Sequence, residues 1–159
     1  MREIVINDKG QAVAPQSQPI IKQDFLSDHK TRIYWLGGAG IMVHSHQTNI
    51  MIDPVLEGFD IPLLYQVPIL PQDVEKLDGI LITHIDNDHF SRPTCHHLKD
   101  VCLQYYAPNY VADVMNEEGL KTEKHDINDC FQLHNISVQL TPAWHNWQNG
   151  SSKWQYRYW

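Results

Sequence analysis

The strongest constraint on this chain is a short apolar run that leads directly into a cluster of potential metal ligands. The run is Gly79–Thr83, and an unbroken apolar run of this kind is typical of a strand buried on both faces. Two imidazoles and two carboxylates follow within six residues: His84, Asp86, Asp88 and His89. A buried strand fixes the start of the loop that follows it, so these side chains can converge.

The residue types in this cluster indicate a metal site. In an extended segment, residues two apart point the same way, so His84 and Asp86 can reach one ion together. A turn through Asn87 would swing Asp88 and His89 towards a second position. Imidazole and carboxylate ligands suit zinc, manganese or iron, and the three cysteines lie outside the cluster. The alternative is a polar loop whose acids cap the next helix, but capping alone does not explain four potential ligands at this density.

Local patterns on both sides of the cluster predict alternating elements. Before it, three short strands with tight connections favour an antiparallel meander over residues 33–36, 41–44 and 49–52. Asp73 is expected to cap a short helix that runs through Leu77. The elements expected after the cluster are a helix from its N-cap Ser91 to about Lys99, a strand over 101–106, a helix over 109–118 that stops at Gly119, and a hairpin-like pair over 130–133 and 136–141.

Composition limits the class of protein. Apolar residues make up 42% of 159 residues and charged residues 19%, which indicates one globular domain with a real core. The net charge of −7 disfavours a basic nucleic-acid-binding face, so no nucleic-acid partner is expected. Cys95, Cys102 and Cys130 form no CxxC pair, and the most apolar stretch, Ile61–Leu70, is broken by prolines and too short to span a bilayer. We therefore expect a cytoplasmic protein in a reducing compartment.

The cluster resembles the His-x-His-x-Asp-His motif of metallo-β-lactamase-fold hydrolases, with Asp86 where a second histidine is commoner. Trp35–Gly40 and Ile50–Pro54 are similar to the opening strands of the branch that contains ascorbate-6-phosphate lactonase and the N-acyl-phosphatidylethanolamine phospholipase D-like enzymes. The resemblance covers about residues 32–147. It implies an α/β fold, the metallo-β-lactamase-like αββα sandwich. Because carboxylate is a harder ligand than imidazole, Asp86 makes manganese a rival to zinc.

The resemblance also implies roles for individual residues. The aspartate at the position of Asp53 steadies the metal loop without touching metal in this family. His145, which follows the last expected strand, matches the family's next ligand position, although a lone histidine is more often a satisfied polar residue. His84, Asp86 and His145 would hold a first ion with an open position, and Asp88 and His89 would contribute to a second, giving one or two Zn²⁺ or Mn²⁺ ions per complete domain. Asp88 is the expected catalytic residue, which orients the nucleophile and takes part in proton transfer.

The family's bridging aspartate, in a Gly-Asp-[Ser/Thr] turn, and its final histidine are not found before Trp159. We therefore expect residues 31–159 to form the N-terminal half to two-thirds of a single domain. Residues 1–30 are expected to form an extended leader before it. The exposed half-sandwich would favour self-association into a homo-oligomer.

The function expected from this resemblance is a metal-dependent hydrolase that uses a metal-activated water on a small anionic ester or lactone, such as a sugar-phosphate lactone. A metal-dependent phosphodiesterase is one alternative. A truncated, non-catalytic metal-binding module is another. The amount of metal bound and the hydrolysis of generic esters discriminate between these readings.

Overall fold

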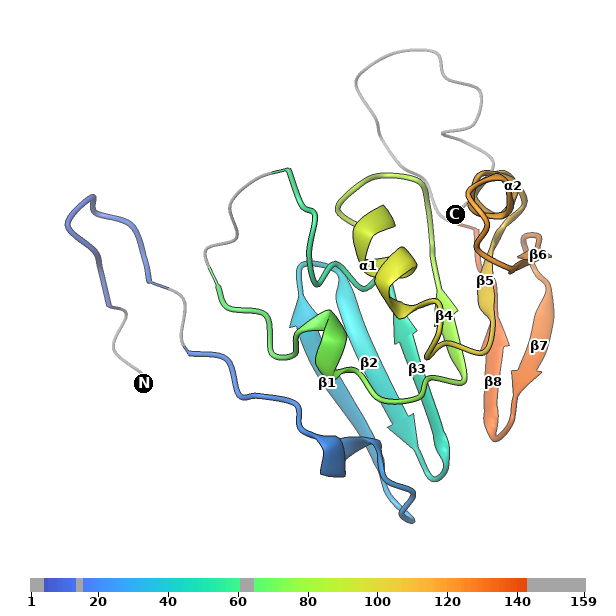
Figure 1. The fold of residues 1–159 in the computed structure, drawn as a ribbon, viewed down its shortest axis with the longest axis horizontal. Coiled ribbons are helices and arrows are strands. Elements are labelled where there is room, and N and C mark those ends of the chain that lie inside the picture. Colours follow the sequence, from blue (N-terminus) through green and yellow to red (C-terminus); the bar gives the residue numbers. More distant parts are fainter. Residues whose placement is uncertain (1–4, 14–15, 61–64, 143–159) are drawn as a thin grey trace.

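The computed structural model describes residues 5–13, 16–60 and 65–142, and its centre is a six-stranded sheet (Figure 1). The strands, in sheet order, are β1 Thr31–Gly37, β2 Gly40–Ser45, β3 Thr48–Ile52, β4 Gly79–Leu81, β5 Tyr105–Pro108 and β6 Thr122–His125. The pairs β1–β2 and β2–β3 are antiparallel, whereas β3–β4, β4–β5 and β5–β6 are parallel. The predicted meander is confirmed, and it forms one half of a mixed sheet.

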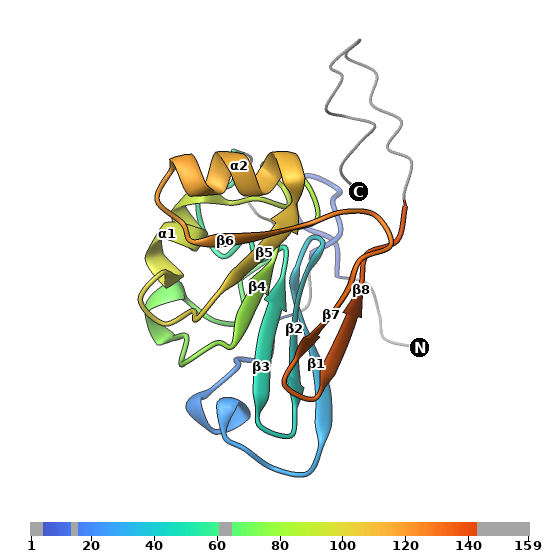
Figure 2. The same ribbon diagram turned by 90° about the vertical axis from the view of Figure 1, so that its right-hand side faces the viewer.

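Helices cover one side of this sheet and a hairpin lies on the other (Figure 2). The helices are α1 Arg92–Leu98 and α2 Asn109–Glu117, and the hairpin consists of β7 Cys130–Leu133 and β8 Ile136–Gln139. Neighbouring residues of β5 show the two sides. The Tyr105 hydroxyl donates to the carbonyl of Cys95 in α1 at 2.7 Å, whereas the Tyr106 ring stacks on Phe131 of β7 with centroids 4.7 Å apart. Helices, sheet and second sheet are therefore three successive layers, as the expected α/β sandwich requires.

The two helices begin and end where the sequence predicts. The side chain of Ser91 accepts a hydrogen bond from the backbone N–H of Thr94 at 3.2 Å, which caps α1. Gly119 follows α2 with φ +81°, a conformation that glycine adopts at little steric cost. Val111 and Met115 turn one face of α2 into the core.

Two local predictions are wrong, and one strand was not predicted. Asp73–Leu77 is not a helix: a 3-10 turn, η2 Pro71–Asp73, ends early, and Leu77 instead pairs with Cys102 in a parallel bridge. The strand expected over 101–106 starts only at Tyr105, because the N–H groups of residues 101 and 102 still bond to the last turn of α1. The strand β6 was not predicted at all. Its sequence, Thr-Glu-Lys-His, has no apolar run, and as an edge strand it needs none.

Asn135, between β7 and β8, hydrogen-bonds the hairpin to the end of the sheet where β2 turns into β3. Its amide donates to Ser45 Oγ at 2.8 Å and accepts from Thr48 Oγ1 at 2.6 Å. Both hydroxyl groups belong to the residues that flank the β2–β3 turn. These bonds fix the position of β7 and β8 relative to β2 and β3.

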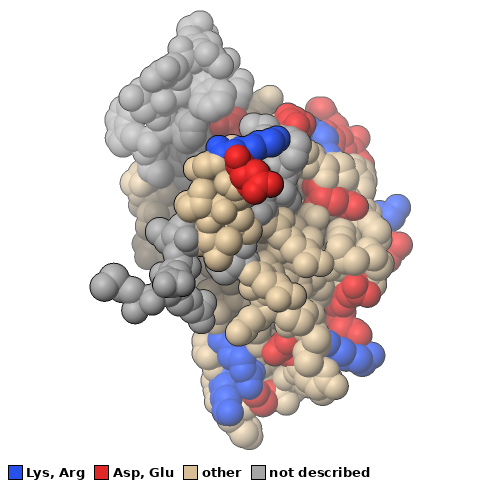
Figure 3. Space-filling view, turned by 90° about the vertical axis from the view of Figure 1, so that its left-hand side faces the viewer, with Lys and Arg blue, Asp and Glu red and all other residues tan. Residues whose placement is uncertain are grey.

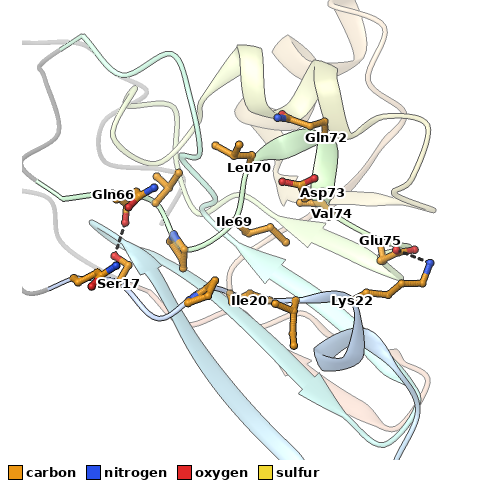
Figure 4. A pocket seen from close by; sticks show the side chains of 15 residues that line it. Ser17, Ile20, Lys22, Gln66, Ile69, Leu70, Gln72, Asp73, Val74 and Glu75 are labelled. Carbon is orange, nitrogen blue, oxygen red and sulfur yellow. Dashed lines mark hydrogen bonds and ion pairs between the residues drawn. The ribbon is translucent and has the colours of Figure 1, made fainter.

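Part of the N-terminal segment packs against the domain. A 3-10 turn, η1 Lys22–Phe25, precedes β1, and Ile20 and Phe25 belong to the buried core. Residues 16–22 lie along residues 66–75 with a cavity of about 770 Å³ between them (Figure 4), and no residue of the 84–89 cluster lines it. The division of the chain at residue 31 stays a prediction.

On the face shown in Figure 3, lysine and arginine side chains stand in small groups among acidic ones. Within the described residues, no helix has the length and apolar character needed to cross a membrane.

Candidate metal centre

The 84–89 cluster begins just after β4 and beside the end of β3. The backbone N–H of Asp53, the residue after β3, donates to the carbonyl of Leu81 at 2.9 Å and so holds the two strand ends together. The loop then turns back, because the N–H groups of His89 and Phe90 both donate to the carbonyl of Asp86, at 2.9 and 2.7 Å. Phe90 is buried in the core and anchors the far end of the loop.

Three of the predicted ligands come together. Single donor atoms of His84, Asp88 and His89 all lie within 4.8 Å of one another. The two imidazole rings are 3.8 Å apart between centroids, and Asp88 Oδ2 lies 3.7 Å from His89 Nε2. Side-chain exposure rises from 4% at His84 through 22% at His89 to 57% at Asp88, so the cluster has a buried base and an open side.

The other two predicted ligands, Asp86 and His145, are not part of this group of three. Asp86 Oδ2 lies 3.5 Å from His84 Nε2, next to the three-residue group but not within it. His145 lies outside the described residues. The division of the ligands between two ion positions therefore stays a prediction.

Asp53 has the supporting role that the family resemblance implies. Its carboxylate is buried and accepts from the Thr83 N–H at 2.7 Å, from Thr83 Oγ1 at 2.6 Å and from His89 Nδ1 at 2.8 Å. The residue adopts φ +47°, a left-handed conformation that aspartate and asparagine tolerate better than most residues. Asp53 thus fixes both the start of the metal loop and the orientation of one of its imidazoles.

Thr83 sets which nitrogens of the imidazoles face the cluster. Its single hydroxyl proton goes to Asp53, so its oxygen accepts from His84 Nδ1, which lies 3.0 Å away. His89 Nδ1 likewise donates to the Asp53 carboxylate, which has only acceptors. In both neutral rings the proton is therefore on Nδ1 and Nε2 has the lone pair. That is the tautomer in which Nε2 binds a metal ion.

The same carboxylates act on the charge of His89. Burial lowers the pKa of His89, but the hydrogen bond to Asp53 and the charges of Asp53, Asp88 and Asp86 together outweigh burial and raise it. A metal ion would compete with a proton for this ring, because only the neutral imidazole is a ligand.

Sequence reasoning missed the part played by Thr83 and by the loop after β3. Thr83 did carry a signal, as a hydroxyl residue at the end of an apolar run. The loop after β3 carried no such signal, because its contacts join residues 27 to 38 positions apart in the sequence. Thr94 Oγ1 accepts from the N–H groups of Leu56 and Glu57 at 3.1 Å, and Asn87 donates to Asp60. These bonds hold residues 56–60 beside the metal loop.

Two imidazoles and a carboxylate, supported by a buried second carboxylate, form a donor set that suits zinc, manganese or iron. The donor atoms of His84, Asp88 and His89, which lie within 4.8 Å of one another, are the structural observation behind this fit. The prediction of a metal-binding cluster is consistent with the described residues, while the identity of the metal stays open to measurement.

Comparison with known proteins gives a family match. The model of the β-lactamase superfamily domain matches residues 48–157. A UPF0173 metal-dependent hydrolase of Methanopyrus kandleri is 26% identical over 117 residues, which are 72% of this chain and 47% of that protein. A UPF0173 metal-dependent hydrolase of Oenococcus oeni is 27% identical over 121 residues, 72% of this chain and 49% of that protein. The chain spans about half the length of these curated relatives.

Solved structures share the fold at low sequence identity. A putative metal-dependent hydrolase from Parabacteroides distasonis superposes with a TM-score of 0.57 at 21% identity, over 80% of this chain and 51% of that one. CmlA, a diiron β-hydroxylase from Streptomyces venezuelae, gives a TM-score of 0.60 at 18% identity, over 73% and 24%. At these identities the likeness concerns the fold alone.

Proposed function

The chain belongs to the β-lactamase superfamily, and from this premise we propose that it supplies the metal-binding half of a metal-dependent hydrolase. The observation that carries the proposal is the convergence of His84, Asp88 and His89 at the carboxyl end of β4, with Asp53 holding His89. The names of the two curated relatives point the same way. The finer branch, with ascorbate-6-phosphate lactonase and the phospholipase D-like enzymes, stays a prediction.

In this proposal each residue of the cluster has a separate task. Nε2 of His84, Nε2 of His89 and the carboxylate of Asp88 hold a divalent cation, with Asp86 and His145 as further candidate ligands. Such a cation supplies Lewis-acid chemistry, which lowers the pKa of a water molecule and polarises the scissile carbonyl or phosphoryl group. Asp53 and Thr83 orient the two imidazoles. Asp88, the most exposed of the three side chains, orients the attacking water and accepts its proton at a carboxylate oxygen.

The test of this proposal is metal binding followed by turnover. The purified chain is stripped with a chelator and reloaded with Zn²⁺ or Mn²⁺, and bound metal is counted by mass spectrometry. His84→Ala is expected to lose the bound ion. His96→Ala is the matched control, because His96 is exposed on α1 and lies outside the cluster. Equal metal content in wild type and His84→Ala would overturn the proposal.

Hydrolysis is then measured on the loaded chain with p-nitrophenyl acetate and bis(p-nitrophenyl) phosphate. Turnover of the ester supports the esterase or lactonase reading, and turnover of the diester supports a phosphodiesterase. Metal binding without turnover of either would show a metal-binding module. The predicted small anionic substrate and the predicted homo-oligomer stay predictions until substrate profiles and solution mass are measured.

A further inference from the structure

A second cavity shares its wall with the metal cluster. It has a volume of about 470 Å³, and His84 and His89 line it together with residues of β5, β6, β7 and β8. It therefore lies between the first sheet and the hairpin, directly beside the candidate ligands. Ligand pockets commonly have volumes of roughly 300 to 1,000 Å³.

One wall of this cavity is a group of three rings. Phe131 stacks on Tyr106 and on His125, with centroid distances of 4.7 and 4.0 Å and interplanar angles of 16° and 15°, and the Tyr106 and His125 rings lie next to each other with centroids 5.9 Å apart. The three rings come from β5, β6 and β7, so the wall exists only where the two sheets meet. Rings packed against one another in this way give the cavity a rigid, largely apolar wall.

Few of the side chains that line the cavity could pair with a charged group of a ligand. None of the described residues that line it is Lys, Arg, Asp or Glu, and Val138 and Leu140 contribute apolar side chains to its lining. A phosphate or carboxylate placed away from the His84–His89 end would lose its hydration without gaining an ionic partner. An uncharged aromatic group would instead exchange water for apolar contact, and cavities of roughly 150 Å³ already accept benzene.

We propose that this cavity is the specificity pocket of the metal site and that it takes the uncharged aromatic group of an ester. The ester carbonyl would then lie at the His84–His89 end of the cavity, within reach of the metal cluster. This inference rests on the proposed function, and it differs from the sugar-phosphate lactone expected from sequence. It makes Tyr106, Phe131 and Val138 determinants of specificity.

The test uses acetophenone, an uncharged aryl ketone that resembles such an ester and cannot be hydrolysed. Its binding to the full chain is followed by proton NMR with either Mn²⁺ or Zn²⁺ in the site. Paramagnetic Mn²⁺ is expected to accelerate relaxation of the acetophenone protons in a saturable way, and diamagnetic Zn²⁺ is not. In the metal-free chain, benzoate, which carries a charge on a ring of the same size, is expected to bind at least about ten-fold more weakly than acetophenone.

Two variants localise the binding. Val138→Phe fills the cavity from β8 and is expected to weaken acetophenone binding at least about ten-fold. Ile33→Phe is the matched control, because Ile33 is exposed on β1 and does not line the cavity. Thermal unfolding of both variants checks that each is folded.

The outcomes separate this inference from the proposed function. Loss of acetophenone binding in Val138→Phe but not in Ile33→Phe supports the pocket, and it can be measured in the metal-free chain as well. Wild type that binds no acetophenone, or binds it equally in both variants, overturns the pocket. Acetophenone bound without Mn²⁺-dependent relaxation places the pocket away from the ion and also overturns it. A chain that binds neither Mn²⁺ nor Zn²⁺ contradicts the proposed function instead.

Discussion

The carboxylate of Asp53 accepts a hydrogen bond from His89 Nδ1 at 2.8 Å, across 36 positions of the sequence. Asp53 directly follows β3, and His89 lies in the loop after β4, so this bond joins the antiparallel half of the sheet to the candidate metal loop, residues 84–89. Partners of this kind fix the ring orientation of a ligand, and their loss commonly reduces metal affinity by about 10- to 100-fold.

Replacing Asp53 by asparagine tests this link. Asparagine keeps the size of the side chain and tolerates φ +47°, but it loses the charge and one acceptor oxygen. We expect Asp53→Asn to bind Zn²⁺ about 10- to 100-fold more weakly, measured by competition with a chromophoric chelator. Asp129→Asn, in an exposed turn, is the control. Unchanged affinity in Asp53→Asn would show that the bond does not orient His89.

The hydroxyl of Thr83 is tested by removing it without changing the shape of the side chain. Thr83→Val is expected to lower metal affinity by about ten-fold, because His84 Nδ1 loses its acceptor, while Thr83→Ser retains it. Thr48→Val is the control: it also removes a hydroxyl that donates a hydrogen bond, but one bonded to Asn135 at the opposite end of the sheet. Thr48→Val should lower the unfolding temperature and leave metal affinity unchanged. If both valine variants lose affinity alike, the effect is one of general stability.

Substitutions at two glycines allow the energetic cost of backbone strain to be measured separately from the cost of steric crowding. Gly58 and Gly119 have similar φ values, +74° and +81°, but a Cβ at Gly58 would lie 2.5 Å from Pro93 Cγ, whereas none of the described atoms comes within 4 Å at Gly119. Gly119→Ala is expected to cost about 1 kcal/mol of the free energy of unfolding. Gly58→Ala is expected to cost about 1 to 3 kcal/mol more, because the rigid ring at the start of α1 must move. Urea unfolding measures both, and equal costs would contradict the close approach.

The three cysteines should differ in reactivity. Cys130 is exposed, whereas Cys95 and Cys102 are buried. Burial raises the pKa of the Cys102 thiol to about 12 and that of Cys95 still further. Since the thiolate is the nucleophile, iodoacetamide at pH 8 should label one thiol per native chain and all three in denaturant.

These raised pKa values determine whether the stability of the folded chain rises or falls with pH. The buried thiols stay neutral in the folded chain while they ionise in the unfolded one, at a pKa of about 8.5. Their contribution to stability is therefore present below that pH and declines as the pH rises towards 12. Cys102→Ala should flatten the alkaline part of a stability profile measured by urea unfolding. A profile identical to that of wild type would show that Cys102 does not titrate in this way.

Local patterns in the sequence predicted the elements that local physics determines. The meander over β1 to β3, the cap at Ser91 and the stop at Gly119 each depend on a few neighbouring residues, and each was correct. The strand β6 escaped prediction because its existence depends on backbone pairing with β5 and not on its own side chains. The short helix predicted from Asp73 through Leu77 was wrong because the pairing of Leu77 with Cys102 outweighed the local cap at Asp73.

In the candidate site, too, features that depend on neighbouring residues were predicted and features that depend on distant contacts were not. His84, Asp88 and His89 were recognisable because they are close in sequence, and Asp53 because the family resemblance marks it. The cavity wall of Tyr106, His125 and Phe131 had no local signal, since its rings meet only after β5, β6 and β7 have packed. Contacts between distant segments form the cavity that we propose as the substrate side of the site.

The parallel pairing of β3 with β4 has a consequence for the order of folding. The meander closes through short turns, whereas Asp53 can reach His89 only after the long connection between β3 and β4 has been closed, at a larger loss of chain entropy. The ligand geometry is thus completed late, and a metal ion added during refolding would report on the slow step. A chain that has formed its first three strands still has no oriented imidazole at residue 89.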